Sequence, residues 1–263
     1  MNTGRTKIDF YSEESPYELQ YEAGREIKSL KTLAIIADAL NRPLSELCAL
    51  EVGCFTGEIS LRLLPHFQKY VAIDIDEKNI ERAVNKAGDS KRDVFHVMDA
   101  ERLEFQDESF DVIICSHVYE HVLHPKTMMR EIHRVLRPDG ICYFAAGNRL
   151  CFMEPHHCLP FLTLMPKTLA NSYLNLFRKK ARYNENFLFL PELRKLVIDF
   201  FVSDYTLAVL REPEKFMATD MLLSGTWKHR VANYVLPKLY FATPTYIWVL
   251  KKQVEQLDSF CVK

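Results

Sequence analysis

The sequence predicts an α/β protein built on a doubly wound, mostly parallel sheet. Between residues 47 and 148, five short apolar runs alternate with segments whose apolar residues recur at helical spacing. The first three runs each end at an acid, namely Glu51, Asp74 and Asp99. Parallel strands joined by right-handed crossovers have their carboxyl ends at one edge of the sheet. We therefore expect the three acids to lie together where open α/β sheets bind ligands.

Length and charge place the chain among ordinary globular proteins. Its 263 residues can bury one large core, and the formal net charge of -1 gives no reason to expect a nucleic-acid partner. The N-terminal segment does not have the build of a signal peptide. No apolar run approaches the roughly 18 residues of a membrane span, so we expect a cytoplasmic protein.

The cysteines and histidines give no metal-binding pattern. Seven cysteines are present, and four of them lie in or beside predicted strands, which indicates reduced structural thiols (Cys48, Cys54, Cys115 and Cys142). The motif His156-His157-Cys158 lacks a second pair at ligand spacing. No metal is expected.

A glycine-punctuated turn follows the first strand. Residues 47–52 form the strand, Gly53-Cys54-Phe55-Thr56-Gly57 the turn, and a helix begins at Glu58. Glycine lets the backbone approach a bound molecule, and a helix N-terminus favours a carboxylate or phosphate. A purely steric reason for the two glycines is the alternative. The turn has neither the G-x-G-x-x-G spacing of dinucleotide sites nor the Gly-Lys-Ser/Thr ending of a P-loop.

Asp74 is the first candidate ligand contact beyond the turn. It ends the second strand, residues 70–74, and lies 21 residues beyond Gly53. This is the spacing of a strand–helix–strand unit whose carboxylate accepts hydrogen bonds from both hydroxyls of a ribose. Asp76 is the competing acid. Apolar residues continue at helical spacing behind Asp76, so we interpret it as a helix N-cap.

The remaining strands of the alternating series are expected at residues 94–98, 110–115 and 141–146. A helix opened by Pro125 is expected to close at residues 137–140, immediately before the last of these strands.

The rest of the chain divides into three parts. Residues 1–46 are expected to form an N-terminal helical cap, with a helix from about residue 17 to residue 40. Residues 149–190 interrupt the pattern as a lid or substrate insertion. Residues 191–263 complete the domain with a helix at 190–197 and strands at 202–210 and 244–250, the last followed by a charged tail.

In combination these motifs resemble class I methyltransferases that use S-adenosylmethionine, of the type 11 subgroup. The resemblance covers residues 47–148, and it is carried by Glu51 with the glycine turn, Asp74, Asp99-Ala100, residues 110–115 with Glu120-His121, and Arg137-Pro138-Asp139-Gly140. It implies a Rossmann-like sheet of seven strands, with strand seven inserted antiparallel between five and six. One departure is Phe55, where the family usually has glycine.

The resemblance also implies a set of site residues. Glu51 and Gly53 would face the methionine end of S-adenosylmethionine, and Asp74 would face the ribose. Asp99 and Ala100 would face the adenine, and Ser116 and His117 would line the sulfonium side. The full set of expected cofactor contacts is Glu51, Gly53, Cys54, Gly57, Asp74, Ile75, Asp99, Ala100, Ser116 and His117.

The function implied is methyl transfer to a small-molecule, lipid or lipid-linked glycan acceptor. For a hydroxyl acceptor a base assists, and we expect His117 or His121 in that role, with His156 and His157 as further candidates. Residues 159–182 are apolar first and basic next, which favours peripheral membrane contact; a packed lid with a solvated end is the alternative.

A second hypothesis is a protein that binds the cofactor but has lost transfer, serving as a regulatory or partner subunit. Phe55 is the feature that permits it.

Overall fold

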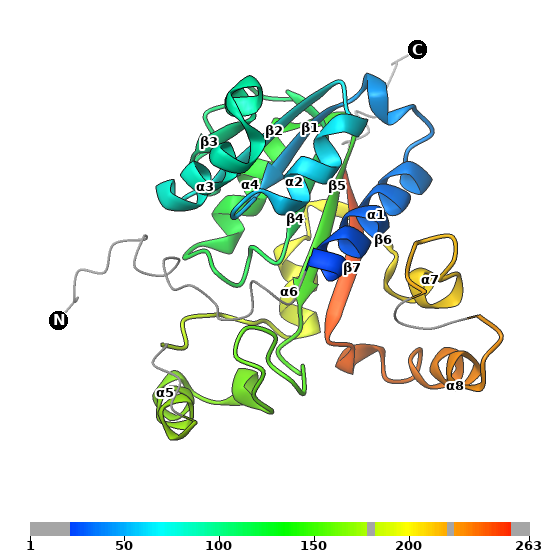
Figure 1. The fold of residues 1–263 in the computed structure, drawn as a ribbon. Helices are drawn as coiled ribbons and strands as arrows, with labels where there is room; N and C mark the ends of the chain where they lie inside the picture. The colour runs from blue at the N-terminus through cyan, green and yellow to red at the C-terminus, as the bar shows by residue number, and fades with distance from the viewer. Residues whose placement is uncertain (1–21, 178–181, 220–223, 254–263) are drawn as a thin grey trace, which may run out of the picture.

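The fold is centred on one seven-stranded sheet. The computed structural model describes residues 22–177, 182–219 and 224–253. The strand order is β3-β2-β1-β4-β5-β7-β6, and β7 alone runs antiparallel, between β5 and β6 (Figure 1). The strands are β1 (Cys48–Val52), β2 (Lys69–Asp74), β3 (Phe95–Val97), β4 (Phe110–Ser116), β5 (Leu136–Gly147), β6 (Phe200–Asp204) and β7 (Thr245–Lys252). The predicted fold class, including the antiparallel seventh strand, is confirmed.

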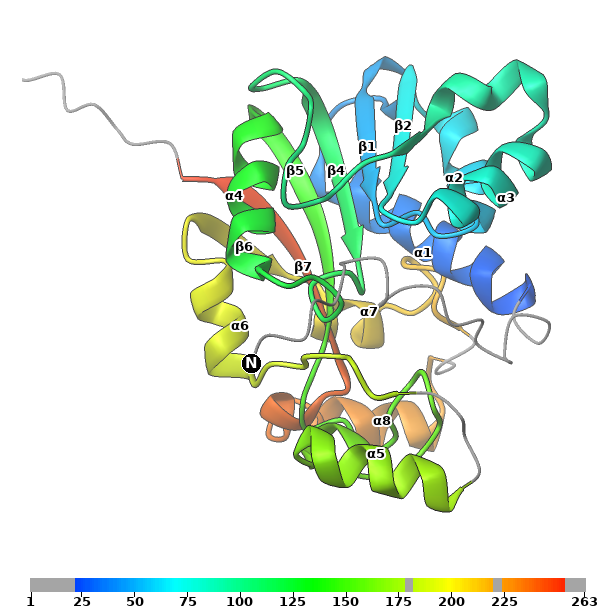
Figure 2. The ribbon, with the colours of Figure 1, turned by 90° about the vertical axis from the view of Figure 1, so that its left-hand side faces the viewer.

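Helices cover both faces of the sheet because neighbouring residues of the central strands point to opposite sides. Leu50 and Ile113 pack in the core under α4 and α6, whereas Ala49 and Ile114 pack in the core under α1 and α3. Figure 2 shows α4 and α6 on one side of the strands and α1, α2 and α3 on the other. The helices are α1 (Glu22–Ala39), α2 (Glu58–Leu63), α3 (Glu77–Ala87), α4 (Pro125–Val135), α5 (Lys167–Leu176), α6 (Leu190–Leu196), α7 (Thr206–Arg211) and α8 (Trp227–Val235).

The closing turn expected at residues 137–140 is part of a strand. Helix α4 ends at Val135 and β5 begins at Leu136, directly opposite Phe110. The pairing then jumps to Val112 with Ile141, so residues 137–140 form an irregularity inside β5. The expectation of a separate turn was wrong because the extra residues are absorbed within the sheet.

The strand expected at residues 202–210 is also shorter than predicted. Strand β6 ends at Asp204, and Thr206 begins α7. The carboxylate of Asp204 accepts a hydrogen bond from the backbone N–H of Thr206 at 2.8 Å, a contact that favours a turn over continued strand. The apolar run after Asp204 is therefore helical.

The insertion packs around a small core of its own. Beyond the carboxyl end of β5, side chains from the loop, from α5 and from the return segment cluster together (Leu159, Leu162, Ala170, Leu174, Tyr183 and Phe187). Figures 1 and 2 place α5 and α8 beyond the carboxyl ends of the parallel strands. Most of the basic stretch, residues 178–181, and the N-terminal residues 1–21 lie outside the described residues.

No helix within the described ranges is both long and apolar enough to cross a membrane.

Candidate active site

The glycine turn lies against the end of β2 and against Val118. Gly53 has a φ of 73°, and its N–H and that of Cys54 both donate to the carbonyl of Ile73, at 2.8 and 2.9 Å. A Cβ on Gly53 would come within 2.7 Å of Val118 Cγ2. Both the backbone conformation and the close approach therefore require glycine at this position.

Gly57 and Cys54 serve packing more than ligand contact. A Cβ on Gly57 would lie 2.8 Å from that of Ala83 on α3, so the steric reason is sufficient there. The Cys54 side chain is buried in the core beneath the turn, where burial raises the pKa of its thiol well above the ordinary value. The carbonyl of Cys54 accepts the N–H of Gly57 at 3.0 Å. Their predicted contact with a cofactor remains a prediction.

Glu51 presents a buried carboxylate next to the turn. Ser60 and Tyr70 both donate to its Oε2, at 2.5 and 2.8 Å. No described residue donates to Oε1. Burial raises the pKa of Glu51, and the two hydrogen bonds oppose that rise. The oxygen left over is suited to a cationic group such as an ammonium.

Asp74 is held in place by the turn. The N–H of Phe55 donates to Asp74 Oδ2 at 2.8 Å, and the N–H of Asp76 donates to Oδ1 at 2.9 Å. Phe55 has a φ of 51°, so a non-glycine residue occupies the left-handed conformation that glycine adopts readily. Asp76 accepts from the N–H of Lys78 at 2.9 Å, which confirms it as the N-cap of α3. The Asn79 amide also donates to Oδ1, at 3.5 Å, so Asp74 keeps an unused lone pair on Oδ2 at the sheet edge. Ile75 follows it there, partly exposed.

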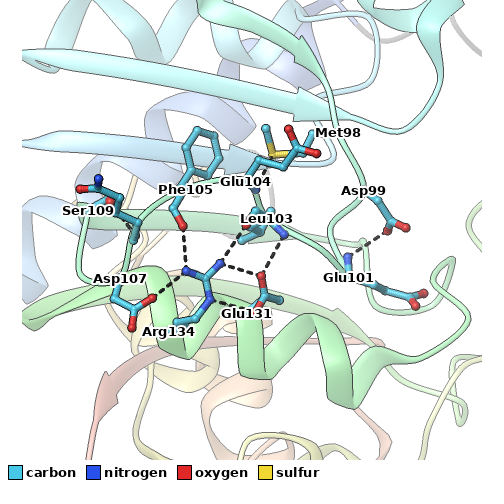
Figure 3. A network of polar contacts seen from close by, with 11 residues as sticks. Met98, Asp99, Glu101, Leu103, Glu104, Phe105, Asp107, Ser109, Glu131 and Arg134 are labelled. Carbon is cyan, nitrogen blue, oxygen red and sulfur yellow. Dashed lines mark hydrogen bonds and ion pairs between the residues drawn. The ribbon is translucent and has the colours of Figure 1, made fainter.

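Asp99 and Ala100 lie on the loop between β3 and β4, which Arg134 of α4 anchors (Figure 3). Asp99 Oδ1 accepts from the N–H of Glu101 at 2.9 Å, and Ala100 packs against the core. The Arg134 guanidinium donates to two carboxylates and two backbone carbonyls of the loop and of α4, at 2.7 to 3.0 Å: Glu131, Asp107, Leu103 and Phe105. Arg134 therefore holds the segment that follows Asp99 against α4.

Truncating Arg134 should loosen this loop. We expect Arg134→Ala to lower the free energy of unfolding by about 2 kcal/mol, because charge-assisted hydrogen bonds and backbone carbonyls lose their partner together. Denaturant unfolding measures the loss. Arg130→Ala on the same helix is the control. The Arg130 guanidinium donates an exposed hydrogen bond to Thr127, so a change within about 0.5 kcal/mol is expected. Equal losses in both variants would contradict an anchoring role for Arg134.

Two buried oxygens at the end of β4 have no donor among the described residues. One is Ser116 Oγ, and the other is Glu120 Oε2, in a side chain that is fully buried. Glu120 Oε1 lies 3.2 Å from His117 Nδ1, and the backbone of His117 takes a φ of 57°. Burial would raise the pKa of Glu120, but the hydrogen bond and charge of His117, with the charge of His121, hold it below its ordinary value. Such atoms are usually paired in folded proteins, so they point to a ligand site.

The insertion brings a second histidine–carboxylate pair to this edge. Glu154 is fully buried, and its Oε1 lies 2.7 Å from His156 Nδ1. Its Oε2 accepts the backbone N–H of His157 at 2.5 Å. The His156 ring packs edge-on against His121, with 4.9 Å between centroids. The predicted candidates His121 and His156 are therefore in contact, although they come from different segments.

Lys28 of α1 is a site residue that the sequence reasoning missed. It interacts electrostatically with Glu120 and Glu51; burial lowers the pKa of its ammonium, and the two carboxylates oppose that change. In the sequence, Lys28 cannot be distinguished from any other lysine on an amphipathic helix, such as Lys31. Only the packing of α1 over the sheet distinguishes it.

The accepting groups of the site fit a cofactor with one cationic end and a hydroxylated sugar. Glu51 Oε1 can accept a hydrogen bond from an ammonium, and Asp74 can accept from hydroxyls. Gly53, which has no Cβ, lies in the turn between these two carboxylates. Ser116 Oγ and Glu120 Oε2 add polar atoms at the next strand end. In the ranges that the structure describes, no three potential metal ligands gather.

The sheet order and the acids at the strand ends define a Rossmann-like domain. Residues 50–144 match the family model of a methyltransferase domain. The chain is 32% identical over 109 residues to a ubiquinone biosynthesis O-methyltransferase of Parvibaculum lavamentivorans, covering 41% of this chain and 43% of the relative. It is 34% identical over 110 residues to the protein of that name from Agrobacterium fabrum, covering 41% and 44%.

A solved S-adenosylmethionine dependent methyltransferase from Mesorhizobium loti shares the fold. Its TM-score is 0.55 at 15% identity, over 86% of this chain and all of that one. The match to the curated relatives spans less than half of their length. Residues 50–144 of the chain are therefore a methyltransferase domain of the class I, S-adenosylmethionine-dependent type 11 group.

Proposed function

We propose that this protein binds S-adenosylmethionine at the β1–β2 corner and transfers its methyl group to a hydroxyl of an amphipathic acceptor. The observation that carries the proposal is the glycine turn flanked by two carboxylates, Glu51 and Asp74, that both keep accepting capacity. The O-methyltransferase name of the curated relatives supports oxygen as the acceptor atom.

The chain's own residues bind and orient the cofactor. Glu51 Oε1 takes the ammonium, and Lys28 supplies positive charge for the carboxylate at the same end. Asp74 accepts from the ribose hydroxyls, and Asp99 with Ala100 lies on the adenine side. When bound, S-adenosylmethionine supplies a methyl group already activated by its sulfonium. The remaining task of the protein is to align the acceptor oxygen with that methyl group and to remove the acceptor's proton.

The amphipathic acceptor is supported by the surface beyond the strand ends. The insertion exposes Phe161 and Leu176 there, and α8 with its following loop exposes Trp227, Tyr234 and Phe241. Cations accompany these rings, at Lys228, Arg230 and Lys238, whereas residues 224–243 contain no acid. Aromatic and apolar side chains among cations suit the boundary of an anionic bilayer.

A transfer assay tests the proposal. The protein is incubated with methyl-labelled S-adenosylmethionine and either catechol or 4-nonylcatechol, and mass spectrometry locates the label. We expect label on a hydroxyl oxygen, with a higher kcat/KM for the alkylated catechol. Cofactor binding without transfer to either probe would favour the binding protein without catalysis. The left-handed φ of Phe55 weakens the argument for that alternative, because the turn conformation is kept without glycine.

Asp74→Ala should weaken binding of S-adenosylmethionine by about 1 to 3 kcal/mol, because charge-assisted hydrogen bonds to the ribose are lost in a partly buried site. The turn also loses its contact with the N–H of Phe55. Titration calorimetry measures the affinity. Asp76→Ala is the control, expected to cost about 1 kcal/mol of stability through the lost N-cap and to leave affinity unchanged. The reverse result would exchange the roles of the two acids.

Membrane contact predicts a salt-dependent partition onto anionic vesicles. Basic residues near such a surface contribute about 1 kcal/mol each, so Lys228→Glu with Arg230→Glu should lower binding at low salt by at least ~10-fold. Co-sedimentation measures the bound fraction. Lys251→Glu, a single charge reversal near the far end of β7, is the control and should have little effect. Absence of wild-type binding at low salt would refute the membrane contact.

A further inference from the structure

Two histidine–carboxylate pairs meet at the carboxyl ends of β4 and β5. His117 lies against Glu120, and His156 lies against Glu154. The pairs differ in closeness: the nitrogen–oxygen distance is 3.2 Å in the first and 2.7 Å in the second. His117 follows β4 directly, whereas His156 is on the insertion, the part of the chain that the match to the methyltransferase model does not reach.

The backbone around Glu154 holds this second pair in place. The N–H of Glu154 donates to the carbonyl of Leu159 at 3.0 Å, and the N–H of Cys158 donates to the carbonyl of Glu154 at 2.9 Å. The second carboxylate oxygen of Glu154 is used by the N–H of His157. The carboxylate is therefore pinned at both oxygens, and it fixes His156 through Nδ1, which leaves Nε2 as the nitrogen that can accept a proton.

Contacts between the insertion and the end of the sheet keep His156 at the candidate site. Phe187 packs against the His156 ring and against Gly147, where a Cβ would come within 2.4 Å of the Phe187 ring. The N–H of Asn186 donates to the carbonyl of Glu120 at 2.8 Å. The His156 side chain keeps 32% of its surface exposed, so an acceptor and water can reach it.

We propose that His156, oriented by Glu154, is the catalytic base that takes the hydroxyl proton of the acceptor. The inference rests on the proposed function. As the acceptor oxygen bonds to the methyl carbon, the carbon–sulfur bond breaks with its electron pair on sulfur, and the hydroxyl proton moves to Nε2 of His156. The proton then passes to water. Glu154 acts as a positioning residue that stabilises the charged imidazole.

The charged groups around His156 determine the direction in which its pKa is shifted. Burial alone would lower the pKa of His156, but the hydrogen bond and charge of Glu154, with the charges of Glu185 and Glu120, raise it above its ordinary value. His121, the other ring against it, has a pKa lowered by burial. Since the base works in its neutral form, the rate should fall as pH drops through the raised pKa of His156.

Titration, kinetic and binding measurements on variants test the base. In protein without cofactor, NMR titration should show the pKa of His156 falling in Glu154→Gln, and the acid limb of kcat for 4-nonylcatechol should move to lower pH with it. His156→Gln should lose at least ~100-fold in kcat, while calorimetric binding of S-adenosylmethionine changes less than about threefold. Added imidazole should partly restore the rate of His156→Ala. The exposed His124→Gln is the control and should leave rate and pH profile unchanged.

The outcomes separate the two proposals. Full activity in His156→Gln would overturn the role of His156 as the base and leave the proposal of methyl transfer in place. An acid limb of the kcat profile that does not move in Glu154→Gln would do the same. A shift of the limb in His117→Gln with none in Glu154→Gln would assign the base to the first pair. No transfer by the wild type to either catechol would contradict the proposed function and the base together.

Discussion

Gly53→Ala is expected to weaken binding of S-adenosylmethionine and to destabilise the fold. The new Cβ would meet Val118 Cγ2 at 2.7 Å, and an alanine at a φ of 73° is strained as well. The left-handed conformation costs roughly 1 to 2 kcal/mol and the overpacking a further 1 to 3 kcal/mol. Because Val118 is stiff at χ1, the turn is expected to move instead, away from Glu51 and Asp74.

Calorimetry and denaturant unfolding measure the two effects of Gly53→Ala. We expect an affinity loss of at least ~10-fold together with a loss of about 2 to 4 kcal/mol in the free energy of unfolding. Gly225→Ala separates the two causes, because Gly225 has a φ of 77° with nothing within 4 Å of the added Cβ. That control should lose only about 1 kcal/mol of stability and no affinity. Unchanged affinity in Gly53→Ala would mean that the turn does not approach the cofactor.

Asp111→Ala should cause the largest loss of stability, at the opposite edge of the sheet. Asp111 is the second residue of β4 and is 1% exposed. Its Oδ2 accepts from the N–H of Cys48 at 2.9 Å and from Arg137 at 2.6 Å, and its Oδ1 accepts from Arg42 at 3.1 Å. Removing the carboxylate leaves the N–H of Cys48 and the Arg137 guanidinium without this partner and leaves Arg42 with Asp139 alone, and breaking such a buried pair typically costs about 3 to 5 kcal/mol.

The same carboxylate predicts a pH dependence. Burial would raise the pKa of Asp111, but the hydrogen bonds from Cys48 and Arg137 hold it below the ordinary value. A lowered pKa in the folded state contributes stability that is present above the ordinary pKa of about 4 and is lost as pH falls through the lowered value. The wild type should therefore lose stability in acid more steeply than Asp111→Ala does.

Asp139→Ala is the matched control for Asp111. Asp139 contacts the same Arg42 at 3.2 Å, but its side chain is 69% exposed. Exposed ion pairs contribute about 0 to 1 kcal/mol, so a small change at all pH values is expected. Urea unfolding at neutral and acid pH compares the three proteins. Similar losses in both variants would show that burial of Asp111 does not matter.

Local chemistry explains what the sequence could predict. The N-cap role of Asp76 follows from a short side chain before a helical pattern, and the strand ends follow from apolar runs that stop at acids. The errors arise where the structure depends on contacts that the apolar pattern of a segment does not include. The irregularity at residues 137–140 depends on how β5 pairs with β4, and the helix after Asp204 depends on one side-chain contact that the apolar pattern of residues 202–210 does not report.

Contacts between distant segments were beyond prediction. Lys28 joins the site only because α1 packs over the sheet beside α2. Glu154 and His156 are two residues apart, so their pairing is local. The contact between the His156 and His121 rings instead depends on the insertion folding back onto the sheet, where the N–H of Asn186 donates to the carbonyl of Glu120. Phe55 looked like a departure from the family, whereas its φ of 51° keeps a conformation that no sequence pattern reveals.

The most direct measurement is transfer of labelled methyl groups by the purified protein from S-adenosylmethionine to 4-nonylcatechol. We expect labelled product on the hydroxyl oxygen, with loss of label transfer in Gly53→Ala. Tight binding of S-adenosylmethionine by the wild type with no labelled product from either catechol would contradict the account.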